Sequence, residues 1–91
     1  MKDVVWNSLK NRSNNSKHGI FFEEASEVFF DLLSLTVTDD KHSWEEKRFI
    51  TIEETSHGKL IVVFHLETES EIRIFSARKP TKSERINYEE R

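Results

Sequence analysis

The stretch RFITIEETSHGKLIVVFHLETESEIRIFSARK, residues 48–79, decides the fold. Short polar turns, SHG and the ESE region, divide it into runs rich in β-branched and aromatic residues: RFITIEET (48–55), KLIVVFHLET (59–68) and EIRIFSARK (71–79). Strands joined by turns this short pair antiparallel with their neighbours. The segment 60–66 is apolar at consecutive positions apart from His65, which is typical of a strand covered on both faces. We therefore expect an antiparallel meander with the middle run at its centre.

The preceding segment, residues 21–33, predicts the main core helix. Its apolar side chains recur at helical spacing, at Phe22, Ala25, Val28 or Phe29, Leu32 and Leu33. Acidic residues near its start suit the positive end of a helix dipole. Residues 33–39, LSLTVTD, then predict a strand, and the polar loop 39–47 leads into the meander.

The N-terminal residues predict a capped helix. Residues 3–6, DVVW, form either a short strand or a cap over the core. Asn7 is a suitable N-cap for a helix that runs to about Lys17, and Gly19 is suited to end it.

The C-terminal residues predict one more short helix. Pro80 breaks the last strand, and Thr81 with Glu84 gives the T-x-x-E pattern of a capping box. Together these elements predict the α+β class. We expect a single domain, residues 1–91, with an antiparallel sheet of about four strands, N-terminal helices and a short C-terminal helix.

The composition indicates one small folded domain without a membrane segment. Of the 91 residues, 35% are hydrophobic and 34% are charged, which leaves room for a single core. No apolar run approaches the roughly 20 residues of a membrane span, and the N-terminus lacks the hydrophobic stretch of a signal peptide. We therefore expect a cytoplasmic protein with no membrane contact. The absence of cysteine excludes disulfides and thiol catalysis.

The histidines and acidic residues do not form a metal-binding pattern. His18, His42, His57 and His65 show none of the i, i+4 spacings that bring zinc ligands together. Adjacent acidic residues diverge on a helix or strand, which argues against a paired-carboxylate hydrolase. We expect neither a metal site nor a cofactor.

Basic residues gather at the two ends of the chain. Residues 1–18 carry four basic residues against one acidic, residues 19–72 carry four against thirteen, and residues 73–91 carry six against three. The net charges of these segments are therefore +3, −9 and +3. If the two ends meet in the fold, they form a positive patch that attracts phosphate. Alternatively, the charges only keep a small domain in solution.

The order and spacing of polar and aromatic residues resemble the BrnT family over nearly the whole chain. The segments that carry the resemblance are W-N-x-x-K-x-x-x-N-x-x-K-H-G (6–19), F-E-E-A-x-x-V-F-x-D (22–31), E-x-R-F-I (46–50), I-R-I-F-S-A-R-K (72–79) and E-R-x-x-Y-E (84–89). The family usually has aspartate after the tryptophan, where this chain has Asn7. Both residue types are good helix N-caps.

This resemblance implies an activity and partners. BrnT proteins are ribonuclease toxins of type II toxin–antitoxin modules, with a fold similar to RelE-type toxins. The resemblance therefore implies metal-independent cleavage of messenger RNA, which inhibits translation and growth, and neutralisation by a ribbon-helix-helix antitoxin like BrnA. It also implies a larger toxin–antitoxin assembly that binds operator DNA through the antitoxin.

Such cleavage needs a group that moves protons and cations that hold the phosphate. His18 is the candidate for proton transfer, because an imidazole titrates near neutral pH. Lys17, Arg48 and Arg78 are the candidates for holding phosphate. The secondary candidates are Lys10, Asn14, Arg73, Glu84 and Tyr88, of which Lys10 and Asn14 share one helix face with Lys17 and His18.

Each candidate also has a purely structural explanation. His18 and Lys17 complement a helix C-terminus, and Arg48 and Arg73 pair with acidic neighbours. Arg78 pairs with Glu84 or Glu89, and Tyr88 packs against the sheet. A module that binds nucleic acid or protein without catalysis is the alternative function.

Overall fold

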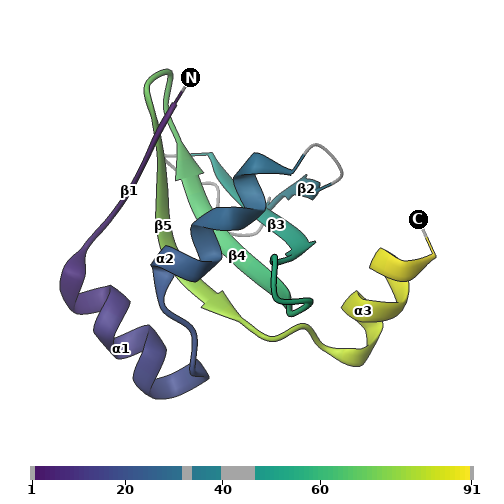
Figure 1. Ribbon diagram of the computed structural model, residues 1–91. Helices are drawn as coiled ribbons and strands as arrows, with labels where there is room; N and C mark the ends of the chain where they lie inside the picture. The colour runs from purple at the N-terminus through teal and green to yellow at the C-terminus, as the bar shows by residue number, and fades with distance from the viewer. Residues whose placement is uncertain (1, 32–33, 40–46, 91) are drawn as a thin grey trace.

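The computed structural model describes residues 2–31, 34–39 and 47–90. Within these residues the elements follow in the order β1 (Asp3–Trp6), α1 (Ser8–His18), α2 (Phe22–Ala25), the 3-10 helix η1 (Ser26–Phe30), β2 (Leu35–Thr38), β3 (Arg48–Glu54), β4 (Leu60–Glu67), β5 (Glu71–Arg78) and α3 (Lys82–Glu89) (Figure 1). The predicted loop 39–47 lies largely outside the described residues. The α+β class is confirmed, and no described helix is long and apolar enough to cross a membrane.

The strands form one sheet in the order β1-β5-β4-β3-β2. The pairs β2–β3, β3–β4 and β4–β5 are antiparallel, with β4 at the centre of the sheet, so the predicted meander is confirmed. The prediction was a sheet of about four strands, and the described residues form five, because β1 adds a strand that pairs parallel with β5. Of the two alternatives for residues 3–6, the short strand is confirmed, and its Val4 and Trp6 pack against the core.

One face of the sheet is covered by helices. Strands β4 and β5 contribute Ile61, Val63, Ile74 and Ala77 to a buried cluster. The rest of this cluster consists of Ile20, which lies between α1 and α2, and of Phe22, Ala25 and Val28 from α2 and η1, all fully buried. Figure 1 shows α2 and η1 running across the sheet on this side, which we call the covered face.

The predicted core helix at 21–33 is wrong in length. It is one turn of α-helix, α2, followed by the tighter helix η1, and Asp31 is already extended with φ −101° and ψ 121°. The Ser26 hydroxyl donates a hydrogen bond to the Glu23 carbonyl, a local bond that competes with regular helix. The predicted helical positions Leu32 and Leu33 lie outside the described residues.

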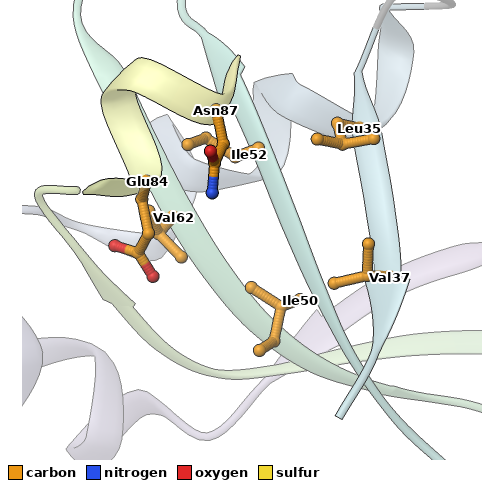
Figure 2. Close-up of a pocket in the computed structure, with 7 residues that line it drawn as sticks. All are labelled: Leu35, Val37, Ile50, Ile52, Val62, Glu84 and Asn87. Atoms are coloured by element: carbon orange, nitrogen blue, oxygen red, sulfur yellow. The ribbon is translucent and has the colours of Figure 1, made fainter. Parts of the chain in front are cut away.

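The opposite face of the sheet, which we call the open face, is only partly covered within the described residues. Ile52, Leu60 and Val62 are buried there, with Tyr88 of α3 packed against them. Beside α3 lies an apolar groove of about 200 Å³. Figure 2 shows its lining, which is Leu35, Val37, Ile50, Ile52 and Val62 from the sheet and Glu84 and Asn87 from α3.

The predicted helix caps are confirmed. The Asn7 side-chain oxygen accepts hydrogen bonds from the amides of Leu9 and Lys10, so asparagine caps α1. Gly19 ends that helix with φ 70°, a left-handed conformation that favours glycine. Thr81 and Glu84 form the reciprocal capping box at the start of α3.

Candidate functional site

The candidate site begins at an irregularity in β5. His65 of β4 pairs with Ile74, whereas the preceding Phe64 pairs with Ser76, so Phe75 is an extra residue without a cross-strand partner. This β-bulge explains why Ile74 and Ala77 both lie on the covered face, although they are three residues apart. It also turns the consecutive residues Phe75 and Ser76 towards the clefts described next.

Two clefts meet at this bulge. The first, which we call the helix cleft, is lined by Lys10, Ser13, Asn14, Lys17 and His18 of α1 together with Phe75 and Ser76. The second, the arginine cleft, is lined by Asp39, Arg48, Phe64, Phe75, Ser76 and Arg78. Because Phe75 and Ser76 line both, the clefts are adjacent. The structure therefore brings together the predicted residues Lys10, Lys17, His18, Arg48 and Arg78.

Asn14 fixes helix α1 beside β5. Its amide nitrogen donates to the carbonyl oxygens of Ile20 and Ala77 at 2.9 and 2.8 Å, and its oxygen accepts from the Ala77 amide at 3.1 Å. Asn11 adds a second anchor, since its oxygen accepts from the Phe22 amide at 2.7 Å. Asn14, a secondary candidate for RNA binding, lines the helix cleft, and these bonds of its buried amide group also make it a structural anchor.

The cationic residues of α1 are exposed at the mouth of the helix cleft. Lys10, Lys17 and His18 all have exposed side chains. Lys17 and His18 occupy the last turn of α1, where the helix dipole favours positive charge. This end of the helix therefore presents one amine and an imidazole to a ligand in the cleft, and Lys10 adds a second amine two turns earlier in the helix.

The arginine cleft alternates cations and aromatic rings. The Arg48 guanidinium carbon lies 4.9 Å from the centroid of the Phe75 ring, and that of Arg78 lies 5.0 Å from the centroid of Phe64. The two rings are 6.4 Å apart and tilted by 51°. Partly desolvated pairs of this kind hold the guanidinium groups in place.

Arg78 also forms a bidentate ion pair with Glu84 at 2.8 and 3.0 Å. The hydrogen bond from Arg78 holds the pKa of Glu84 below its usual range, and the same bond raises the pKa of Arg78. This pair joins the end of β5 to α3, as the structural explanation of Arg78 predicted. A phosphate at Arg78 therefore competes with Glu84.

Three secondary candidates line neither cationic cleft. Arg73 is exposed, with a guanidinium nitrogen 3.5 Å from a Glu71 oxygen. Glu84 borders the apolar groove, and the Tyr88 hydroxyl donates a hydrogen bond to the buried Glu53. Tyr88 thus lines a separate acidic cleft with Glu27, Phe30, Asp31, Glu53, Glu54, Thr55 and Ser56. Its carboxylates repel phosphate, so this cleft does not suit RNA.

The prediction omitted the aromatic and hydroxyl residues at the centre of the site. Phe64, Phe75 and Ser76 connect the two clefts. The sequence gives no local signal for them, because strict alternation along the run IRIFSAR would place Ser76 on the same face as the buried Ile74. Among the described residues, no group of three or more histidine, aspartate or glutamate side chains could hold a metal ion.

These features define a small α+β protein with two adjoining cationic clefts and a histidine at their edge, an arrangement suited to binding a phosphodiester chain. The family model of the ribonuclease toxin BrnT, of the type II toxin–antitoxin system, matches residues 6–84. The chain therefore belongs to the BrnT family of ribonuclease toxins.

Comparison with solved structures supports the fold. The crystal structure of the Brucella abortus ribonuclease toxin BrnT is similar, with a TM-score of 0.69 and 18% sequence identity, and the match covers 90% of this chain and 100% of that chain. No curated protein sequence matches the chain. The further likeness to RelE-type toxins stays a prediction.

Proposed function

We propose that this toxin cleaves messenger RNA in the cytoplasm without a metal ion, and that the cleavage takes place where the helix and arginine clefts meet. The observation that carries the proposal is that Phe75 and Ser76 line both clefts. His18 and Lys17 line the helix cleft, and Arg48 and Arg78 line the arginine cleft. Residues from α1, β3 and β5, which are far apart in the sequence, thereby line one continuous surface.

The roles of the residues follow from the chemistry of RNA cleavage. His18 takes the proton of a ribose 2′-hydroxyl, whose oxygen attacks the neighbouring phosphorus. The bond from phosphorus to the 5′ oxygen breaks, this oxygen takes up a proton from water as it leaves, and His18 returns its own proton to water. Lys17 and Arg48 stabilise the extra negative charge on the phosphate, and Arg78 joins them when RNA displaces Glu84.

Messenger RNA cleavage would stop translation and growth, so the cell needs an inhibitor. A ribbon-helix-helix antitoxin like BrnA is the proposed partner, and a larger assembly of both proteins would bind operator DNA through the antitoxin. An inhibitor that covers the cationic clefts presents a complementary acidic surface or a helix C-terminus. Antitoxin and RNA are therefore expected to compete, and simultaneous binding of both at full affinity would contradict this part of the proposal.

The test compares three proteins on labelled single-stranded RNA in EDTA: the wild type, His18→Ala and His57→Ala. His57 is the matched control because it is exposed in the turn between β3 and β4, outside both cationic clefts. We expect the wild type and His57→Ala to cleave, and His18→Ala to lose a factor of about 10² to 10⁴. Equal cleavage by all three would remove His18 from the mechanism. No cleavage by the wild type would overturn the proposed activity on free RNA.

A further inference from the structure

The bulge at Phe75 places an aromatic ring where the two cationic clefts join. Bulges often redirect a side chain next to a functional site, and this one puts Phe75 in the lining of both clefts. The ring is half-buried. Neither apolar cluster found among the described residues includes Phe75, so core packing does not account for a phenylalanine here.

The surroundings of this ring are those of a stacking surface. The Arg48 guanidinium lies over Phe75, and Phe64 supports the ring from a neighbouring strand with its own arginine, Arg78, stacked on it. Both aromatic rings and guanidinium planes stack on nucleobases. A nucleotide whose base stacks at Phe75 would have its flanking phosphates within the two clefts that carry the lysines and arginines.

We propose that Phe75, with Arg48 stacked on it, forms a nucleobase subsite that holds one base of single-stranded RNA between the helix cleft and the arginine cleft. This inference rests on the proposed function. Stacking uses the flat face of the base, so the subsite fixes where the RNA lies and tolerates different bases. It thereby positions one phosphodiester relative to His18.

The test measures binding of short 2′-fluoro RNAs, which lack the 2′-hydroxyl and therefore cannot be cleaved by its attack. In one set of oligonucleotides, each position in turn carries an abasic sugar. We expect the wild type to lose about tenfold in affinity when one particular base is removed, and less at other positions. Phe75→Leu should bind the intact RNA about tenfold more weakly, and removal of that base should have no further effect.

Two further variants separate stacking from folding. Phe75→Tyr keeps the ring and should retain both the affinity and the sensitivity to the abasic position. Phe30→Leu is the matched control, because Phe30 is a 70% exposed phenylalanine in the lining of the acidic cleft. It should bind like the wild type. Thermal melting of each variant shows whether the fold is retained.

The outcomes distinguish the subsite from the proposed function. If the wild type binds and cleaves RNA but no abasic position weakens its binding more than the others, the subsite is wrong and the ribonuclease proposal stands. The same conclusion follows if Phe75→Leu keeps the sensitivity of the wild type to the missing base. If the wild type neither binds nor cleaves RNA, both proposals fall. Because the abasic series uses the wild type, it decides the question even if Phe75→Leu does not fold.

Discussion

The two faces of the sheet differ in how they are covered. On the covered face, Ile61 and Val63 of β4 meet α2 and β5 in a fully buried cluster. On the open face, Ile50 of β3 is half-buried beside the apolar groove (Figure 2). Phe64 of β4 is half-buried beside the arginine cleft. A β-sheet needs only one packed face to be stable. The difference teaches that the covered face contributes more of the stability of this small domain, while the open face keeps a groove and a cleft among its partly buried residues.

The sharpest test of this comparison is a matched pair of isoleucine substitutions on neighbouring strands. Ile61→Ala on the covered face should lower the free energy of unfolding by about 4 kcal/mol, because it leaves a cavity that the packed helices cannot fill. Ile50→Ala on the open face should cost about 1.5 kcal/mol, because its side chain is only half-buried. Urea denaturation measures both values. Equal losses of unfolding free energy in the two variants would show that the two faces contribute equally to stability.

Removing the anchor of α1 should have the next largest effect. Asn14→Ala leaves the carbonyls of Ile20 and Ala77 and the Ala77 amide without their partner, which should cost about 3 kcal/mol. Because α1 carries Lys17 and His18, RNA cleavage should fall as well. Asn15→Ala in the same helix is the control, with an expected change within about 0.5 kcal/mol. A harmless Asn14→Ala would mean that β5 does not hold the helix cleft in shape.

Stability should also depend on pH, because His65 on the covered face is only 1% exposed. Burial lowers the pKa of His65 to about 4, Glu67 opposes this shift, and Lys2 lowers the pKa further. In the unfolded chain this pKa is about 6.5, so between about pH 6.5 and pH 4 the unfolded state binds a proton that the native state does not. Stability should therefore fall by about 2 kcal/mol from pH 7 to pH 5.

Denaturation at a series of pH values checks this expectation. His65→Gln should flatten the profile over this range, whereas His57→Gln, at an exposed position, should keep the slope of the wild type. The same slope in His65→Gln as in the wild type would assign the pH dependence to other groups.

The smallest effect is expected for the ion pair beside the open face. Glu84→Gln removes the charge that pairs with Arg78 and should cost about 1 kcal/mol, because both side chains are about one-third exposed. The lowered pKa of Glu84 means that this contribution is present above its unfolded pKa and is lost as the pH falls through the lowered value. Glu89→Gln in the same helix is the control. A loss as large as that of Ile61→Ala would mean that α3 is essential to the fold.

The sequence by itself determined the features that depend on near neighbours. Asn7, Gly19 and the pair Thr81 and Glu84 mark helix ends because a capping side chain bonds to backbone only a few residues away. The strands within 48–79 follow from short turns and β-branched runs in the same way. The cationic face of α1 was also predictable, since helical geometry alone places Lys10, Lys17 and His18 together.

Only the tertiary structure decided the features that join distant segments. The parallel pairing of β1 with β5, the bonds from Asn14 to Ala77 across 63 residues, and the meeting of both cationic clefts at Phe75 are examples. None of them has a local signal, because the free energy of such contacts comes from the burial and hydrogen bonding of groups that meet only in the folded chain. The bulge at Phe75 is the clearest case, since it appears only when β5 is aligned against β4.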